Sequence, residues 1–317
     1  MPTFKVYKGT PTGIQESETT RPDLRGDQVL VKVTASGICG TDLHYKSANM
    51  ALGHEGVGVV REVGPSVQCL RPGDRVGWGY QADSCGLCTY CHAGSEEYCA
   101  ERKIYGEANL DQGISPRPRD AEAAPMMCGG ATVWNALRRY GLSSSSTVGV
   151  LGLGGLGHLA VQFAARLGMN VVLLSTTDSK RDEALKMGAT SFIVVKDQEP
   201  APLAIGTTLD ALVVTSSVPL DYDRYLSILT PQAVILPLTV HFSDFKISQY
   251  QLLAKGIRIQ GTVISSRVEI KKMLAFMARQ DVKPQVMTFA MDREGIESAI
   301  EALEEGKMRY RGVLTAR

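Results

Sequence analysis

Four cysteines lie in one short stretch of the chain: Cys85, Cys88, Cys91 and Cys99. Thiolates are soft ligands, and four of them supplied by one loop leave no coordination position open, which is the pattern of a structural zinc site. A redox centre would need only two cysteines, so thiol–disulfide chemistry is the weaker interpretation. His92 lies in the same loop, and we expect it at the surface because the sulfurs already complete the shell.

A second set of residues could bind a metal ion and still leave room for a substrate. Cys39 precedes His54 by fifteen residues. One histidine and two cysteines occupy three positions of a zinc ion and keep the fourth open, as catalytic zinc requires. Taken alone, Cys39 and His54 would indicate core packing, and only a nucleotide site in the same chain favours the metal. Cys69 fits neither group, and we expect it to be a small buried residue.

A glycine-rich turn at residues 152–157, GLGGLG, follows an apolar strand and opens a helix, which is the context of a dinucleotide site. Gly152 permits the tight turn, Gly154 lets the backbone approach a pyrophosphate, and Gly157 lets the helix pack on the strand. The free amides of the helix N-terminus then face the phosphates. The alternative is a glycine turn that serves packing alone.

The end of the next strand bears on which dinucleotide binds. An NAD site places an acid there for the ribose 2′-hydroxyl. Here residues 175–177 carry hydroxyls, the first acid is Asp178, and the cations Lys180 and Arg181 follow. Hydroxyls and cations suit a 2′-phosphate, so the pattern favours NADP(H). These residues could also merely cap the next helix and form its solvated face.

The elements that must position these groups lie in two parts of the sequence with different patterns. Residues 1–128 hold every cysteine and are dominated by short strands, whereas strands alternate with helices from residue 129 onward. That alternation predicts an α/β fold with a doubly wound parallel sheet. Predicted strands lie at 28–34, 57–63, 148–151, 170–174, 192–195, 211–214, 233–236 and 311–314. Predicted helices begin at Leu156 and cover 179–187, 222–229, 268–279 and 293–305.

Composition excludes several classes of protein. The 317 residues are 44% hydrophobic and 21% charged, with a net charge of +1, so neither disorder nor a strong footprint for nucleic acid or membrane is expected. The longest stretch without charged side chains, 140–165, is interrupted by serines and glycines and is not a membrane span. No targeting segment is visible at the N-terminus. We therefore expect a soluble cytoplasmic protein that acts on small molecules.

Taken together, the motifs resemble the zinc-dependent medium-chain dehydrogenase/reductase family over nearly the whole chain. The most specific are the four-cysteine loop, the turn at 152–157, and Gly53-His54-Glu55 followed by Gly58 and Gly64. Residues 39–44, 123–130 and 175–178 carry a narrower likeness to the cinnamyl-alcohol-dehydrogenase-like, NADP-dependent alcohol dehydrogenases.

The resemblance implies a GroES-like β-rich catalytic domain at 1–128 and 265–317, a Rossmann NADP-binding domain at 129–264, two zinc ions per chain, and a homodimer. It makes Cys39, His54 and Cys128 ligands of catalytic zinc, with Glu55 as an alternate ligand. It also makes Thr41 the hydroxyl beside the substrate oxygen and His44 the solvent end of a proton relay, although His44 could be an ordinary surface histidine. The predicted cofactor-binding residues are Thr132, Gly152, Gly154, Gly155, Leu156, Gly157, Ser175, Thr176, Thr177, Lys180 and Arg311, the last near the cofactor phosphates.

The expected activity is the reversible conversion of primary alcohols to aldehydes, aromatic or allylic ones above all, with NADP(H). Two alternatives stay open: reduction of a C=C or iminium bond on the same scaffold, or an inactive protein that binds zinc and nucleotide. The second alternative arises because the stretch 101–120 is shorter than in the family and contains Pro116 and Pro118, which cannot donate a hydrogen bond within a sheet.

Overall fold

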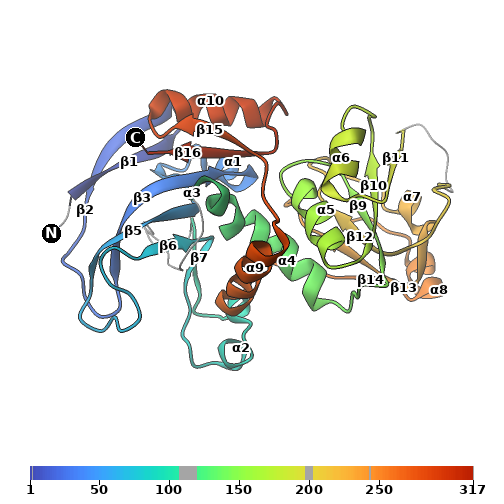
Figure 1. Cartoon of the computed structure of the whole chain (residues 1–317), viewed down its shortest axis with the longest axis horizontal. Helices are drawn as coiled ribbons and strands as arrows, with labels where there is room; N and C mark the ends of the chain where they lie inside the picture. Colours follow the sequence, from blue (N-terminus) through green and yellow to red (C-terminus); the bar gives the residue numbers. More distant parts are fainter. Residues whose placement is uncertain (2, 107–119, 197–202, 243, 317) are drawn as a thin grey trace. The chain divides into compact units, whose positions relative to one another are not determined.

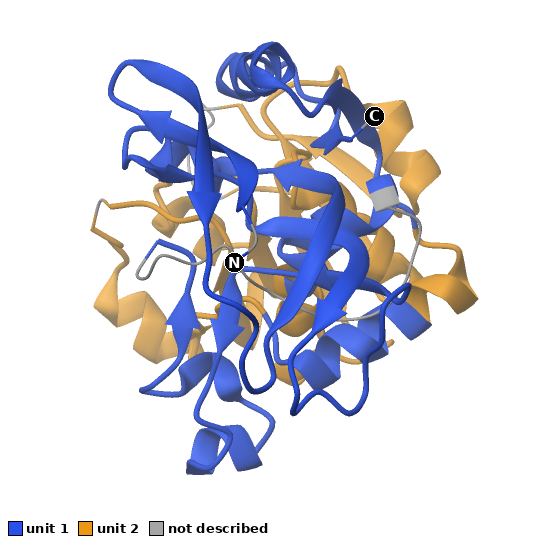
Figure 2. Ribbon diagram, turned by 90° about the vertical axis from the view of Figure 1, so that its left-hand side faces the viewer, with its two compact units in different colours: residues 1–131, 265–275, 283–317 blue, residues 132–264, 276–282 orange. Residues whose placement is uncertain are grey.

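The computed structural model describes residues 1, 3–106, 120–196, 203–242 and 244–316. Most of the shortened stretch, including both prolines, lies outside the described residues. The chain divides into two compact units, shown in different colours in Figure 2. Unit 1 comprises residues 1–131, 265–275 and 283–317, and unit 2 comprises residues 132–264 and 276–282. Their roles as catalytic and nucleotide-binding domains stay a prediction.

Unit 1 is built on a five-stranded sheet in the order β15-β16-β3-β5-β6. Its central strands, β3 (Val29–Ile38) and β5 (Glu55–Val63), are antiparallel. The C-terminal strand β16 (Arg311–Thr315) lies beside β3 with Gly312 opposite Ile38, so the tail of the chain joins its N-terminal third (Figure 1). The edges are β15 (Val286–Ala290) and β6 (Arg75–Trp78).

Smaller elements complete unit 1. Helix α10 (Arg293–Glu304) packs on β15 and β16, and its N-terminus is capped by Asp292, which accepts a hydrogen bond from the Gly295 amide at 2.8 Å. A second sheet has the order β2-β1-β4, and a two-stranded sheet joins β7 to β8. The remaining bounds are β1 (Thr3–Thr10), β2 (Gly13–Thr20), β4 (Met50–Ala51), β7 (Gln81–Asp83), β8 (Lys103–Ile104), α1 (Gly40–Tyr45), α2 (Thr89–His92), η1 (Glu96–Tyr98), α3 (Asp120–Ala123) and η2 (Ala124–Met127).

Unit 2 contains a six-stranded parallel sheet in the order β11-β10-β9-β12-β13-β14. The strand order reverses between β9 and β12, and the four apolar residues at 171–174 of β10 are no more than 1% exposed, as expected of a parallel strand covered on both faces. This confirms the predicted doubly wound sheet. The strands are β9 (Thr147–Leu151), β10 (Asn170–Ser175), β11 (Ser191–Val194), β12 (Leu209–Val214), β13 (Leu229–Pro237) and β14 (Arg258–Ile259).

Three helices of unit 2, α5 (Gly157–Arg166), α6 (Arg181–Met187) and α8 (Gln249–Lys255), end where the sequence provides glycine. Helix α5 packs on β9 and β10, and Gly168 follows it with φ +86°. Helix α6 is closed by Gly188 with φ +110°, a conformation that residues with a Cβ rarely adopt. Unit 2 also contains α7 (Asp223–Leu226). Helices α4 (Gly129–Arg139) and α9 (Arg267–Gln280) each begin in unit 1 and end in unit 2.

Two expectations from the sequence are wrong. The helix expected at 222–229 is the single turn α7, because Leu229 already pairs with Leu209 as the first residue of β13. Cys69 is exposed rather than buried. No helix among the described residues is long and apolar enough to cross a membrane.

Candidate functional site

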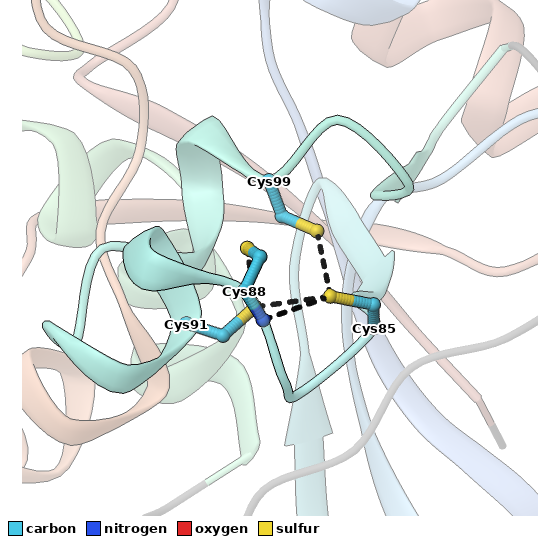
Figure 3. A group of neighbouring side chains, drawn as sticks. All are labelled: Cys85, Cys88, Cys91 and Cys99. Atoms are coloured by element: carbon cyan, nitrogen blue, oxygen red, sulfur yellow. Dashed lines mark hydrogen bonds between the residues drawn. The ribbon is translucent and has the colours of Figure 1, made fainter.

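The four cysteines of the loop at 85–99 point toward one another (Figure 3). The sulfur atoms of Cys85 and Cys91 are 3.9 Å apart, those of Cys88 and Cys91 3.6 Å, and those of Cys85 and Cys99 3.6 Å. A tetrahedron with metal–sulfur bonds of ~2.3 Å has edges of ~3.8 Å, whereas a disulfide bond is only ~2.05 Å long. The separations therefore fit a closed tetrahedral zinc site and exclude disulfides.

A second group of ligand atoms converges in unit 1: those of Cys39, His54, Glu55 and Cys128 all lie within 4.8 Å of one another. Cys39 directly follows β3 and is the N-cap of α1, His54 directly precedes β5, and Cys128 follows η2. The Sγ atom of Cys39 lies 3.2 Å from Nε2 of His54. The three ligands predicted from the resemblance are therefore brought together from segments far apart in the sequence.

A residue absent from the prediction, Asp42, organises this group. Its carboxylate is buried and lies 3.2 Å from Nδ1 of His54, so the imidazole donates through Nδ1 and keeps Nε2 toward Cys39. The backbone amides of Cys39, at 3.0 Å, and Gly53, at 3.2 Å, donate to the same carboxylate. Asp42 is the third residue of α1, the position of the acid in a capping box, and this local pattern could have identified it.

Burial and close contacts shift the pKa values of the three proposed zinc ligands. A hydrogen bond with Cys128, together with the His54 imidazole, holds the pKa of the Cys39 thiol well below its usual range despite burial. The same contact and burial raise the pKa of Cys128. Burial opposes the charged form of His54, but the Cys39 thiolate and the Asp42 carboxylate outweigh it and raise the pKa of the imidazole. The Cys39 thiolate and the Asp42 carboxylate are thus paired with the His54 imidazole between them.

Glu55, the predicted alternate ligand, is paired with Arg311. Both side chains are at most 5% exposed, and the guanidinium binds both oxygens of the carboxylate. Burial raises the pKa of Glu55 to about 7 although Arg311 lowers it. A Cβ atom on Gly37 would lie 2.1 Å from Oε2, so only glycine leaves room for the pair. The guanidinium of Arg311 is buried on Glu55, and its place near the cofactor phosphates stays a prediction.

The donor set fits a zinc ion of the catalytic type. Zinc–sulfur and zinc–nitrogen bonds of ~2.3 and ~2.1 Å in a tetrahedron place sulfur and nitrogen about 3.6 Å apart, and the distance between Cys39 Sγ and His54 Nε2 is 3.2 Å. Two sulfurs and one imidazole would leave one position open.

Thr41 and His44, the predicted relay residues, lie on helix α1, which begins directly after Cys39. Thr41 is half-buried and His44 is exposed. Thr132 is half-buried in α4 and belongs to unit 2.

The turn at 152–157 has the geometry expected of a dinucleotide site. Gly152 has φ +95°, and a Cβ atom on Gly157 would lie 2.0 Å from the Gly152 carbonyl oxygen. Gly154 is different, because a Cβ atom there would meet nothing within 4 Å. Gly152 and Gly157 are therefore required by the fold, whereas the absence of a side chain at Gly154 leaves open space. Gly155 and Leu156, which lie between Gly154 and Gly157 in the turn, are half-buried.

Of the hydroxyl residues at the end of β10, Ser175 is half-buried, and Thr176 and Thr177 are exposed. Ser175 Oγ accepts a hydrogen bond from the Thr177 amide at 3.3 Å. Lys180 Nζ donates to the carbonyl of Leu153, within the glycine turn, at 2.8 Å, which places this cation beside the turn. Arg181 is engaged by Asp178 and by the Phe192 carbonyl at 2.8 Å. Lys180 is thus the better candidate for a 2′-phosphate.

Comparison with known proteins agrees with this geometry. Residues 25–122 match the alcohol dehydrogenase GroES-like domain, and residues 155–279 match the zinc-binding dehydrogenase family. The chain is 32% identical to cinnamyl alcohol dehydrogenase 7 of Oryza sativa subsp. japonica, over 91% of this chain and 85% of that protein. It is 31% identical to NADP-dependent alcohol dehydrogenase C 1 of Mycolicibacterium smegmatis, over 99% and 98%. A solved cinnamyl alcohol dehydrogenase from Sorghum bicolor superposes with a TM-score of 0.90 at 30% identity, covering 99% and 98% of the two chains.

The chain therefore belongs to the zinc-dependent medium-chain dehydrogenase/reductase family, in its cinnamyl-alcohol-dehydrogenase-like branch. This confirms the family and the fold class predicted from the motifs, a GroES-like domain with a Rossmann sheet. It is an oxidoreductase of the alcohol dehydrogenase type, a class that acts on small alcohols and aldehydes.

Proposed function

We propose that the protein interconverts primary alcohols and aldehydes, aromatic or allylic ones in particular, using zinc and NADP(H). The observation that carries this is the convergence of Cys39, His54 and Cys128 within 4.8 Å in a buried site. The relative from Oryza named for cinnamyl alcohol supports an aromatic or allylic substrate. The aromatic ring of Tyr80, 6.0 Å from His54, is compatible with such a substrate.

Each residue of the site would have its own role in the reaction. When bound, zinc supplies a Lewis acid for the substrate oxygen and NADPH supplies the hydride. Cys39, His54 and Cys128 hold the metal, and Asp42 fixes the tautomer of His54. Thr41 would donate the proton to the developing alkoxide, and exposed His44 would return a proton from solvent, because an imidazole can both accept and donate a proton.

NADP(H) is preferred over NAD(H) in this proposal. No carboxylate precedes Asp178 after β10, and Lys180 lies beside the glycine turn, held by the Leu153 carbonyl at 2.8 Å. A cation close to the turn favours a nucleotide that carries an additional phosphate. The relative from Mycolicibacterium named as NADP-dependent supports the same choice.

The first experiment combines metal analysis with turnover. We expect two zinc ions per chain and oxidation of NADPH with an aromatic unsaturated aldehyde that yields the allylic alcohol. His54→Ala should lower kcat by at least about 10³-fold, with the Kd for NADPH unchanged. His92→Ala, which alters an exposed histidine, should retain turnover. A saturated aldehyde as product, or folded protein with no oxidation for any aldehyde, would contradict the proposal.

A homodimer is part of the same proposal. Val240, Tyr250 and Leu253 are 64%, 80% and 72% exposed, and apolar side chains gathered in one segment support an interface between copies. Analytical ultracentrifugation would test it, and a monomer at micromolar concentration would contradict it.

A further inference from the structure

Tyr105 packs against His54 although nothing in its sequence context links the two. It directly follows β8 and is 5% exposed. Its amide donates to the Tyr80 carbonyl at 2.8 Å, which fixes its backbone beside the group of ligands. The ring centroids of Tyr105 and His54 are 4.9 Å apart with the planes inclined by 36°. The tyrosine ring therefore covers one face of the imidazole.

The hydroxyl of Tyr105 reaches the carboxylate that orients His54. It lies 3.3 Å from Oδ1 of Asp42 and 3.3 Å from the Ala51 carbonyl oxygen. Oδ1 of Asp42 is also the atom that accepts from Nδ1 of His54, at 3.2 Å. Tyr105 thus contacts the histidine twice, through its ring and through a shared carboxylate oxygen.

Tyr105 is itself held from behind. The ring of Tyr45 meets it edge to face, with centroids 5.1 Å apart and planes at 81°. Gly106, with φ +93°, permits this packing, because a Cβ atom there would lie 2.5 Å from the Tyr45 ring. The tyrosine has little freedom to leave His54 while Tyr45 and Gly106 are in place.

We propose that Tyr105 is a positioning residue for His54, which sets the plane of the imidazole and the placement of the Asp42 carboxylate so that Nε2 faces the two sulfurs. The inference rests on the proposed role of His54 as a zinc ligand. Partners of this kind orient the ligand, and their loss typically costs 10–100-fold in metal affinity.

Cobalt(II) in place of zinc gives a direct readout, because its absorption bands depend on the identity and geometry of its ligands. The spectrum of the cobalt-loaded wild type minus that of cobalt-loaded His54→Ala isolates the site at His54 from the four-cysteine site. We expect Tyr105→Phe, which keeps the ring and loses the hydroxyl, to shift this difference spectrum and to weaken cobalt binding about tenfold. Tyr105→Leu, which also loses the ring, should approach a 100-fold loss.

A matched control is Tyr222→Phe, because Tyr222 is a 7% exposed tyrosine that packs on Phe245 in unit 2. It should leave the difference spectrum and the cobalt Kd unchanged. If both Tyr105 variants gave the wild-type difference spectrum and a cobalt Kd within twofold of wild type, this inference would be overturned and the proposed function would not. Identical cobalt spectra for wild type and His54→Ala would instead overturn the proposed function, and with it the inference.

Discussion

Charged side chains are buried around the proposed ligands, and each has a partner. Asp42, Glu55 and Arg311 are 2%, 0% and 5% exposed. Asp42 accepts from two backbone amides and His54, and Glu55 is bound by Arg311. Buried charges are tolerated only when paired and hydrogen-bonded, so this part of unit 1 depends on complete pairs rather than on single residues.

Arg311→Met should destabilise the protein by about 3–5 kcal/mol, because it leaves the Glu55 carboxylate buried without its cation. The free energy of unfolding in urea, measured with zinc bound, would check this. Arg293→Met is the control: Arg293 and Glu297 form an exposed pair at 3.0 Å, and its loss should cost less than about 1 kcal/mol. The double variant Glu55→Gln with Arg311→Met should recover part of the loss, and strict additivity of the two effects would contradict the argument.

Residues that act through a local pattern could be predicted, and those that act across the fold could not. The spacing of Cys85, Cys88 and Cys91 is itself the signal of a metal loop, because consecutive turns aim the sulfurs at one point. Arg311 and Glu55 are 256 residues apart, and no spacing rule relates them. Tyr105 lacks a motif altogether. The ligand roles of Cys39, His54 and Cys128 stay a prediction that the geometry supports.

The glycine turn shows how one element serves two demands at once. The backbone of β9 must reverse into α5, which fixes Gly152 in a positive φ and brings Gly157 against the Gly152 carbonyl. Thr215, which directly follows the neighbouring strand β12, donates to the same carbonyl at 2.9 Å and so holds the turn in place. At Gly154 the fold leaves room for a Cβ atom, so the binding of a ligand, rather than the fold, explains why this residue has no side chain.

Gly154→Ala and Gly157→Ala should therefore fail in different ways. Gly154→Ala should leave the melting temperature unchanged and raise the Kd for NADPH at least about tenfold, because its methyl group occupies space that the pyrophosphate approaches. Gly157→Ala should cost about 1–3 kcal/mol of stability, because its methyl group overlaps backbone. Fluorescence titration with NADPH and thermal melting separate the two effects. Unchanged NADPH affinity in Gly154→Ala would contradict the assignment of this turn.

Elements with a clear period were predictable, and the failure at 222–229 has a local cause. The strands of the parallel sheet are continuous apolar runs because both faces are covered. Residues 222–229 are apolar at helical spacing, yet Leu229 pairs with Leu209 and the Leu209 amide donates to the Ile228 carbonyl at 2.8 Å. Pairing with β12 overrides the local preference, and a single sequence does not reveal the partner strand.

At the scale of the whole molecule, the proposed metal and nucleotide sites belong to different units. Among the described residues, both clusters of potential metal ligands lie in unit 1, and the glycine turn lies in unit 2. The tail of the chain contributes β15 and β16 to the unit 1 sheet, so removal of the last strand would damage the unit that contains both clusters. Metal binding should therefore change the stability of unit 1, and nucleotide binding should change the stability of unit 2.

Metal removal and NADPH binding should change the stability of different units. A ligand that binds only the folded state stabilises it by RT ln(1 + [L]/Kd), about 2.7 kcal/mol at one hundred times Kd. Chelation of zinc should lower the melting temperature of unit 1 and split calorimetric unfolding into two transitions. NADPH should then raise only the transition of unit 2, and the same concentration of NADH should raise it less, because the proposed partner of Lys180 is the 2′-phosphate. A single transition that zinc and NADPH shift equally would show that the two units unfold as one and would contradict this separation.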